Sequence, residues 1–330
     1  MSTNRTITYA AALNEALREE MKRDEDVIIL GEDIGDYGGV FNVTKGLIEE
    51  FGRERIIDTP ISEAGFTGAG VGAAMTGLKP VVEIMWVDFT FVAMDQILNQ
   101  AAKMSYMSGG QTAVPMVIRT QGGGGRGNAA QHSQSLEAIF AQVPGIKVVA
   151  PSTPYDAKGL LKQSIREGCP VMFLENKMLY NQRGEVPEEE YVIPLGVADI
   201  KRTGSDVTVV SLSRMVQFSL DAAEQLAQEG GISAEVIDLR TIVPLDVETV
   251  KQSVAKTNRL VIVQEAHRSY GWGAELAARI QEEAFDDLDS PVLRVAAEDV
   301  PIPYNLKLEK ETLPQVADIV REVKKALYRQ

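Results

Sequence analysis

Short apolar runs alternate with helical patterns along most of the chain, and this alternation limits the fold more than any other feature of the sequence. Short, fully apolar strands separated by helices are typical of a mainly parallel sheet that helices cover on both faces. A first helix is expected after Thr8, whose hydroxyl can cap it, and another helix over 91–107. The apolar runs of the first half lie at 27–30, 56–58, 81–85, 114–119, 146–150 and 171–175.

The alternating pattern stops in the polar, acidic stretch between residues 176 and 204, which contains proline and glycine. A second set of apolar runs follows this stretch. We therefore predict two α/β domains, residues 1–185 and 204–330, joined by a linker at 186–203. The apolar runs of the second set lie at 206–212, 234–239, 259–265 and 292–295.

Composition excludes several classes of protein. A formal net charge of -14 disfavours binding to nucleic acid or to an acidic membrane surface. The sequence has no run of about 18 apolar residues and no apolar secretory segment near its start, so we expect a cytoplasmic protein without membrane spans. One cysteine, Cys169, excludes an intramolecular disulfide and is expected to be a buried structural thiol.

The stretch 58–80 combines one carboxylate, Glu63, with a segment made almost entirely of small residues. Helical spacing places several of these small residues on one side, where another backbone can approach closely. One interpretation is tight helix packing, with Glu63 as a solvated acid in the first turn. The other is a closely packed helix between subunits that presents Glu63 to a buried ligand. The small residues on this side are Gly65, Gly68, Ala69, Gly72 and Ala73.

A glycine-rich loop at 121–127 is followed by His132, one of two histidines. The loop lacks the lysine and the serine or threonine of a P-loop, so we expect it to move over a site and not to cradle phosphate. His132 lies between this loop and the next strand, and His267 also follows a strand. Each histidine is either a satisfied polar residue or a functional group at a strand end.

Taken together, six segments resemble the beta subunit of thiamine-diphosphate-dependent 2-oxo acid dehydrogenases, the first enzymes of the pyruvate, branched-chain 2-oxo acid and acetoin dehydrogenase complexes. The resemblance covers practically the whole chain. It implies a pyrimidine-binding domain of the transketolase type, followed by a transketolase-like C-terminal domain. The segments are GED at 31–33, DTPISEAG at 58–65, DFTFVAMDQILNQAAK at 88–103, AAQHSQS at 129–135, PGIKVVAPSTPYDAKGLL at 144–161 and EVIDLRTIVPLD at 235–246.

The resemblance also implies a heterotetramer of two alpha and two beta subunits, with thiamine diphosphate held between an alpha and a beta chain. The sequence contains no GDG followed some 25 to 30 residues later by NN, the motif that would hold Mg²⁺ and the diphosphate. The alpha subunit is therefore expected to hold Mg²⁺, and this chain to form half of an active site.

Site residues follow from the same resemblance. Glu63 matches the glutamate that hydrogen-bonds N1′ of the aminopyrimidine and thereby favours its imino tautomer. Met85 and Phe89 match residues that line the aminopyrimidine pocket. His132 matches the histidine that handles protons as the acyl group passes to the lipoyl arm.

The family also commonly carries a structural potassium ion, bound largely through backbone carbonyls. Such an ion would fix loops and would not react. The matching positions here are Met116, Ser164, Ile165, Glu167 and Cys169.

The expected reaction is oxidative decarboxylation of a 2-oxo acid, with reductive acylation of the lipoyl group of a dihydrolipoamide acyltransferase docked on the C-terminal domain. Pyruvate is the leading substrate, although residues 175–189 are closer to acetoin enzymes and a branched-chain 2-oxo acid is also possible. Two other classes stay open. One is a self-sufficient thiamine enzyme such as a transketolase, which the missing diphosphate motif disfavours, and the other is a noncatalytic scaffolding subunit.

Overall fold

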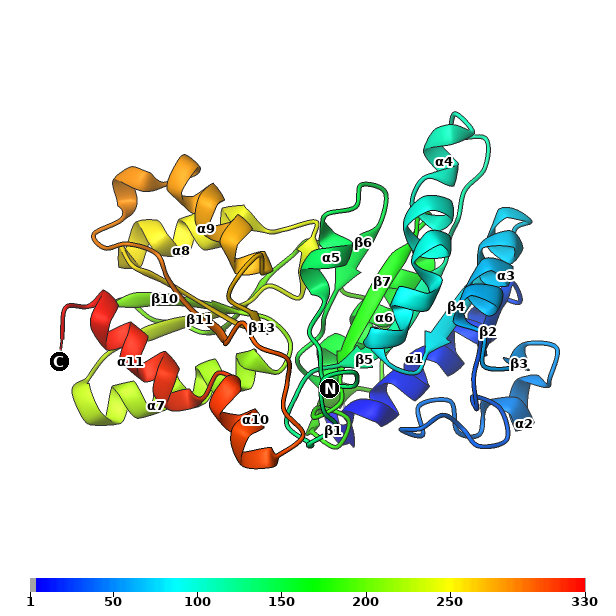
Figure 1. The fold of residues 1–330 in the computed structure, drawn as a ribbon, viewed down its shortest axis with the longest axis horizontal. Helices are drawn as coiled ribbons and strands as arrows, with labels where there is room; N and C mark the ends of the chain where they lie inside the picture. The colour runs from blue at the N-terminus through cyan, green and yellow to red at the C-terminus, as the bar shows by residue number, and fades with distance from the viewer. Residues whose placement is uncertain (1–3, 330) are drawn as a thin grey trace. The chain divides into compact units, whose positions relative to one another are not determined.

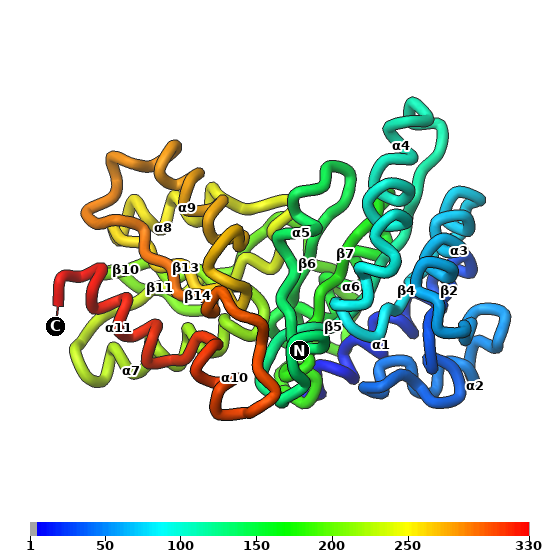
Figure 2. The backbone as a smooth tube through the Cα atoms, viewed as in Figure 1, coloured from blue at the N-terminus to red at the C-terminus, as the bar shows by residue number. Residues whose placement is uncertain are grey.

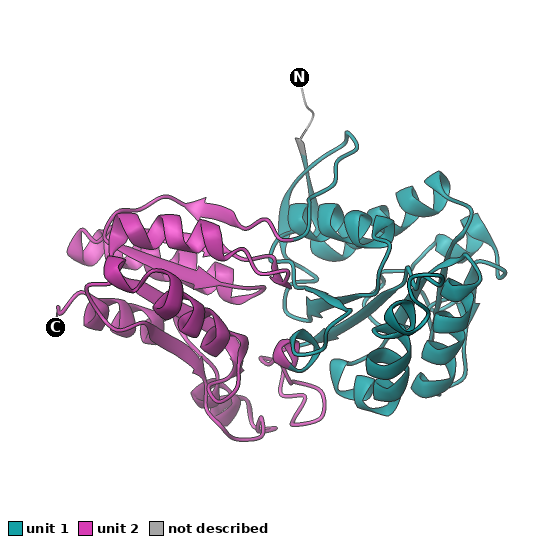
Figure 3. Cartoon of the chain, turned by 90° about the horizontal axis from the view of Figure 1, so that it is seen from above, with its two compact units in different colours: residues 1–122, 139–195 teal, residues 123–138, 196–330 magenta. Residues whose placement is uncertain are grey.

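The computed structural model describes residues 4–329 and divides the chain into two compact units (Figure 3). The first unit comprises residues 1–122 and 139–195, and the second comprises 123–138 and 196–330. Residues 123–138, which the sequence analysis places in the first domain, thus belong to the second unit. The expected linker also differs, because it contains the strand β9 (Asp199–Arg202), which pairs with a strand of the second unit.

A parallel sheet forms the centre of the first unit (Figure 1). Its strands run in the order β6-β7-β5-β4-β2-β3, and every neighbouring pair in this order is parallel. The apolar runs therefore predict these strands correctly. The strands are β2 (Val27–Gly31), β3 (Ile56–Asp58), β4 (Lys79–Ile84), β5 (Val117–Gly122), β6 (Lys147–Val149) and β7 (Val171–Asn176).

Two helices, α1 (Tyr9–Arg23) and α6 (Pro154–Arg166), pack together on one face of this sheet. Alternate strand residues such as Val27 and Ile29 join their core, as the period of two in a strand requires. The predicted cap of α1 is confirmed, since Thr8 Oγ1 accepts a hydrogen bond from the backbone nitrogen of Ala11 at 3.1 Å.

The opposite face of β4 carries α3 (Glu63–Met75), the glycine-rich helix. A Cβ on Gly70 would lie 2.7 Å from Val82 Cγ2, so a glycine here allows the helix to lie against the strand. Gly65, Ala69 and Gly72 point away from the sheet and are exposed. A Cβ on Gly72 would have no atom within 4 Å among the described residues. This outward face of α3 therefore has open space beside it.

The prediction of one continuous helix over 91–107 is wrong. The segment forms a 3₁₀ helix η1 (Val87–Ala93), a π-helix η2 (Asp95–Ala101) and a short α4 (Met104–Met107). The nitrogen of Ala102 bonds to the carbonyl of Ile97, five residues back, which marks the wide turn. Ile97 and Ala102 are both buried, so the apolar spacing predicts burial here but not the type of helical turn.

The remaining elements of the first unit lie around this sheet. An antiparallel ribbon joins β1 (Asn4–Thr8) to β8 (Arg183–Pro187), and its polar sequence carries no strand signal of the kind used above. A short helix, α2 (Leu47–Phe51), precedes β3. The helix α5 (Glu137–Ala141) spans the point where the chain passes from the second unit to the first.

The second unit has a sheet in the order β14-β13-β10-β11-β9, in which only β9 is antiparallel to its neighbour. The helices α7 and α11 pack together, and α8 packs with α9 (Figure 2). No helix among residues 4–329 is long and apolar enough to cross a membrane. Besides β9, the strands of this sheet are β10 (Val207–Ser211), β11 (Ala234–Asp238), β13 (Leu260–His267) and β14 (Leu293–Ala297), and the short strand β12 (Thr241–Val243) lies outside it. The helices are α7 (Met215–Gly230), α8 (Val247–Thr257), α9 (Trp272–Glu283), η3 (Phe285–Asp287), α10 (Leu306–Thr312) and α11 (Val316–Ala326).

Candidate functional site

Glu63 is the first residue of α3 and follows the short connection from β3. Its position in the first helical turn favours a carboxylate, because the unpaired amides of a helix start carry partial positive charge. The residue is only 8% exposed. The structure therefore does not support the interpretation of Glu63 as a solvated surface acid.

A second carboxyl group, that of Glu32, belongs to the same site. Glu32 directly follows β2 and is 7% exposed, and its Oε1 atom has no hydrogen-bond partner among the described residues. Burial raises the pKa of Glu32 to about 7, and the nearby charges of Glu63 and Asp33 add to this rise. A buried, partly protonated carboxyl can donate a hydrogen bond to a polar ligand.

Glu32 lies within GED at 31–33, one of the segments that carry the family resemblance, but the resemblance gives this acid no role. The signal that could have identified it is an acid placed directly after a fully apolar strand. Ligands of parallel α/β sheets bind at this carboxyl end of the strands.

Met85 and Phe89 lie in the segment that follows β4. Met85 is half-buried, and its carbonyl accepts a hydrogen bond from Gln121 Nε2 at 2.9 Å. Phe89 is half-buried in η1, and its nitrogen donates to the carbonyl of Trp86 at 2.9 Å. Because α3 packs against both β4 and η1, the first unit brings Glu63, Met85 and Phe89 onto adjoining elements.

A buried ion cluster lies next to Met85 in the same sheet. Arg119 donates to both carboxylate oxygens of Glu175, at 2.6 and 2.8 Å, and also contacts Glu83. Tyr180 donates to Glu175 at 2.6 Å. The cavity beside this cluster measures about 10 Å³, which is room for about one water molecule. The cluster therefore cross-links the strands and does not form a pocket for a cofactor.

His132 lies in the second unit. It is half-buried, and its backbone nitrogen donates to the carbonyl of Ala129 at 3.4 Å. His267, the other histidine, ends β13 and its Nδ1 lies 2.7 Å from the carbonyl of Glu298. This bond to the segment after β14 supports a structural role for His267.

The glycine loop before His132 already has anionic partners. The nitrogens of Gly125 and Gly127 donate to the two carboxylate oxygens of Glu309, each at 2.8 Å. The nitrogen of Gly124 donates to Glu265 Oε1 at 2.8 Å. These carboxylates occupy the amides that a phosphate would need, in line with the interpretation that the loop is not a phosphate cradle.

The positions matched to a potassium site gather at the C-terminal end of α6 and at the start of β5 and β7. Here the carbonyl of Met116 accepts from the nitrogen of Val171 at 2.9 Å, and the carbonyl of Ser164 accepts from Glu167 at 3.3 Å. Lys147 Nζ lies 2.7 Å from the carboxylate of Glu167. Carbonyls at a helix C-terminus favour a cation, so the residues fit such an ion through their backbone.

The other two matched positions, Ile165 and Cys169, lie in the same turn region. Ile165 is buried in the last turn of α6, whereas Cys169 is only half-buried, in contrast to the buried thiol expected. Burial raises the pKa of the Cys169 thiol. No group of three or more His, Cys, Asp or Glu that could hold a metal ion occurs in residues 4–329.

Two family models match the chain, and the first of them includes residues 123–138, which the structure places in the second unit. One is described as "Transketolase, pyrimidine binding domain" and matches residues 5–183, and the other as "Transketolase, C-terminal domain" and matches residues 196–319. A solved structure described as a split-gene transketolase, inactive beta4 tetramer, superposes with a TM-score of 0.81, at 23% identity and covering 98% of both chains. This likeness confirms the two-domain α/β fold.

Close relatives identify the family more narrowly. The mitochondrial pyruvate dehydrogenase E1 component subunit beta-1 of Arabidopsis thaliana is 53% identical, covering 98% of this chain and 90% of the relative. The pyruvate dehydrogenase E1 component subunit beta of Rhizobium meliloti is 50% identical, covering 98% and 70%. The beta subunit of acetoin:2,6-dichlorophenolindophenol oxidoreductase of Bacillus subtilis is 47% identical, covering 96% of each chain. The chain belongs to this family of transketolase-type, thiamine-dependent dehydrogenase beta subunits.

Proposed function

We propose that the chain is the beta subunit of a 2-oxo acid dehydrogenase and that its substrate is pyruvate. The observation that carries this proposal is the buried Glu63 at the start of α3, beside a buried oxygen of Glu32 that has no hydrogen-bond partner in residues 4–329. These groups suit a polar heterocycle that must exchange a proton with a carboxyl. The relatives named as pyruvate dehydrogenase beta subunits support the choice of substrate.

In the proposed reaction the 2-oxo acid loses CO₂ and two electrons. A lipoyl disulfide takes up both electrons, so that one sulfur receives the acyl group and the other becomes a thiol by taking a proton. Thiamine diphosphate, when bound, supplies the electron sink for the decarboxylation.

The residues of this chain bind, orient and move protons. Glu63 holds a proton at N1′ of the aminopyrimidine, and Met85 and Phe89 position the ring and exclude water from it. His132 moves the proton at the sulfur that becomes the thiol. Met116, Ser164, Ile165, Glu167 and Cys169 hold a structural potassium ion through backbone carbonyls.

An alpha subunit completes the site in this proposal. It supplies the groups for Mg²⁺ and the diphosphate, and two alpha and two beta chains form the tetramer. The exposed outward face of α3 offers close packing to another subunit. The lipoyl-bearing acyltransferase docks on the second unit. A cytoplasmic location stays a prediction.

Acetoin is the second candidate substrate. The acetoin oxidoreductase beta subunit is 47% identical, close to the identity of the pyruvate dehydrogenase relatives. A substrate panel of pyruvate, branched-chain 2-oxo acids and acetoin, tested with the alpha subunit of the same source, decides between these substrates.

The catalytic role is tested with Glu63→Gln in the assembly with the alpha subunit. A glutamine keeps the size of the side chain but cannot exchange the proton, so turnover should fall by at least about 100-fold. Substrate-dependent reduction of an artificial electron acceptor measures it. The matched control is Glu49→Gln, which changes an exposed acid in the first turn of α2 and should leave turnover unchanged. Full turnover in Glu63→Gln would defeat the catalytic role and favour a scaffolding subunit.

A further inference from the structure

The glycine loop has a backbone shape that gathers amide groups. Gly123, Gly125 and Gly127 have positive φ angles of +84°, +109° and +66°, in the region that favours glycine. Left-handed residues at alternate positions turn successive N–H groups toward one point, an arrangement that binds anions. The loop therefore requires an anionic partner, and the structure provides one from a distant part of the chain.

That partner is a pair of carboxylates from the second unit. Glu309 of α10 accepts from Gly125 with one oxygen and from Gly127 with the other, both at 2.8 Å, and Glu265 accepts from Gly124. Arg214 donates to the carbonyl of Gly124 at 3.0 Å and lies 3.7 Å from Glu265 Oε1. We call Glu265 and Glu309, with these loop amides, the carboxylate clamp.

The carboxylate clamp is buried, so its carboxylates depend on the hydrogen bonds from the loop amides. Glu309 is 1% exposed, and the two loop amides are the donors that the structure gives its carboxylate. A buried carboxylate is costly unless charge-assisted hydrogen bonds replace its water. A Cβ on Gly124 would lie 2.4 Å from Leu313 Cδ1, so the loop also packs closely on the chain that follows α10.

The clamp acts on the segment that contains His132. The nitrogen of Gly123 donates to the carbonyl of Gln134 at 2.9 Å, which closes residues 123–134 into a loop. One half of this closed loop is held by Glu309, and His132 lies in the other half, where its nitrogen bonds to Ala129. Release of the clamped half would therefore free the half that carries the histidine.

We propose that Glu309 is a positioning residue for acyl transfer, because its carboxylate fixes the closed loop 123–134 and thereby the place of His132. This inference rests on the proposed function, in which His132 moves a proton at the lipoyl sulfur. Glu309 itself touches neither substrate nor cofactor. Its effect should therefore appear in the transfer step and not in the decarboxylation.

The first arm of the test separates two partial reactions of the assembly with the alpha subunit. In Glu309→Gln one carboxylate oxygen becomes an NH₂ group, which cannot accept from a loop amide. Acylation of a lipoyl domain should fall about 10- to 100-fold, since a displacement near 1 Å has that effect on a reacting group. Reduction of an artificial acceptor, which bypasses the lipoyl group, should stay within about twofold. Glu311→Gln, an exposed neighbour on α10, is the matched control and should change neither rate.

The second arm observes the loop without any turnover. Arg126 is exposed and lies between the two clamped glycines, so trypsin cleavage after Arg126 reports opening of the loop. Cleavage should accelerate about tenfold in Glu309→Gln and stay unchanged in Glu311→Gln. Glu309→Asp keeps the charge but is one methylene shorter, and should show intermediate cleavage and intermediate acylation.

Faster cleavage together with a selective loss of acylation would support the proposal. Faster cleavage with full acylation would overturn it, as would unchanged cleavage. An equal loss of both partial reactions would also overturn it, because it would indicate general damage to the fold. If the unsubstituted assembly shows no activity, the proposed function fails. Unchanged cleavage would then still refute the clamp, and faster cleavage would retain it as a device that holds the loop.

Discussion

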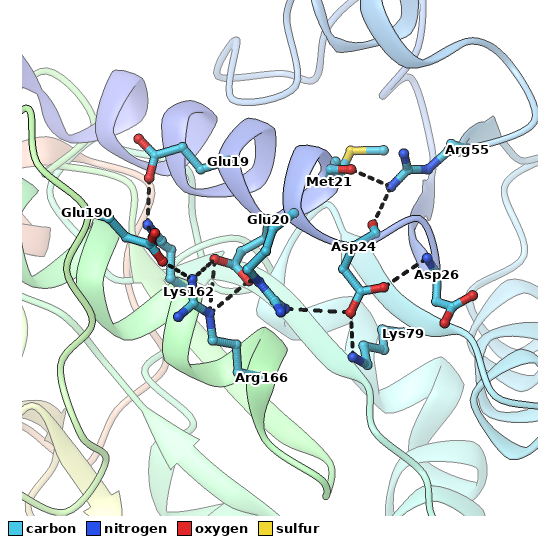
Figure 4. Close-up of polar contacts among 11 residues, drawn as sticks. Glu19, Glu20, Met21, Asp24, Asp26, Arg55, Lys79, Lys162, Arg166 and Glu190 are labelled. Atoms are coloured by element: carbon cyan, nitrogen blue, oxygen red, sulfur yellow. Dashed lines mark hydrogen bonds and ion pairs between the residues drawn. The ribbon is translucent and has the colours of Figure 1, made fainter.

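Two helix surfaces of the first unit differ in how far the rest of the chain covers them. The seam between α1 and α6 buries Glu20, Lys158 and Lys162, and each of these charges meets an opposite charge within the chain. Figure 4 shows the contacts of Glu20 and Lys162. The outward face of α3, formed by Gly65, Ala69 and Gly72, is exposed and has no such complement among the described residues. The charges of the first surface are paired within the chain, whereas the second surface stays open among the described residues.

Ion pairs within the chain balance the buried charges between α1 and α6. Arg166 lies 2.6 Å from Glu20 Oε1, and Lys162 lies 2.6 Å from Glu19 Oε2. Burial opposes the ionisation of Glu19, but hydrogen bonds from Lys158 and Lys162 hold its pKa below the ordinary value. Such a network tolerates poorly the loss of one partner, because the other charge is left buried. The seam should therefore determine stability, and the α3 face should determine assembly.

Arg166→Met should have the largest effect on the seam. It removes one of the two guanidinium groups, those of Arg23 and Arg166, that pair with the fully buried side chain of Glu20, and should lower the free energy of unfolding by about 2–3 kcal/mol. Denaturant unfolding of the chain measures this change. The control Arg321→Met removes an exposed pair with Asp318 and should cost less than about 1 kcal/mol. Equal effects of the two substitutions would remove the distinction between a buried seam and an ordinary surface.

Gly72→Phe should act on the α3 face alone. The new side chain meets open space in this chain, so the free energy of unfolding should change by less than about 0.5 kcal/mol. A clash at a closely packed interface costs about 1–3 kcal/mol, so binding to the alpha subunit or to a second beta chain should weaken about 10- to 100-fold. Analytical ultracentrifugation measures the assembly.

Gly70→Ala is the contrasting variant on the same helix. Its Cβ would lie 2.7 Å from Val82, so it should destabilise the fold by about 1–3 kcal/mol. Normal assembly of Gly72→Phe would show that the outward face of α3 is not an interface.

Glu32→Gln should have the smallest effect, and it tests the raised pKa of this buried carboxyl group at the candidate site. The folded pKa of Glu32, about 7, lies above its ordinary value of 4.5, so the folded state binds more protons than the unfolded state between these pH values. Its contribution to stability is present in full below pH 4.5 and is lost as pH rises through about 7. The variant should lack this decline, which amounts to about 1–2 kcal/mol after screening by solvent. Thermal unfolding between pH 5 and 8 measures it, and parallel profiles for both proteins would contradict the raised pKa.

Local sequence patterns predict much of the fold. Each of the strands β2 to β7 coincides with an apolar run, and Thr8 caps α1 as its hydroxyl suggests. Polar strands escape such patterns, as β1, β8 and β9 show, because pairing and not burial stabilises them. Local patterns also do not predict that η2 is a π-helix, since the same apolar spacing suits both an α-helix and a π-helix.

The residues of the candidate site also fall into two groups, those that a local sequence pattern identifies and those that depend on contacts made only in the folded chain. Glu63 is recognisable because the start of a small-residue helix is a local feature. The contact of Glu309 with Gly125 joins residues 184 positions apart, and no local pattern specifies it. The raised pKa of Glu32 likewise depends on its burial beside Glu63, which only the folded chain creates.

In the proposed function this chain holds one half of a thiamine-dependent active site. This assignment is tested most directly by pyruvate-dependent reduction of an artificial electron acceptor, with thiamine diphosphate and Mg²⁺, for the chain alone and for the chain co-purified with its alpha subunit. We expect activity in the pair and none in the lone chain. Full activity in the lone chain would contradict the assignment and would identify a self-sufficient enzyme.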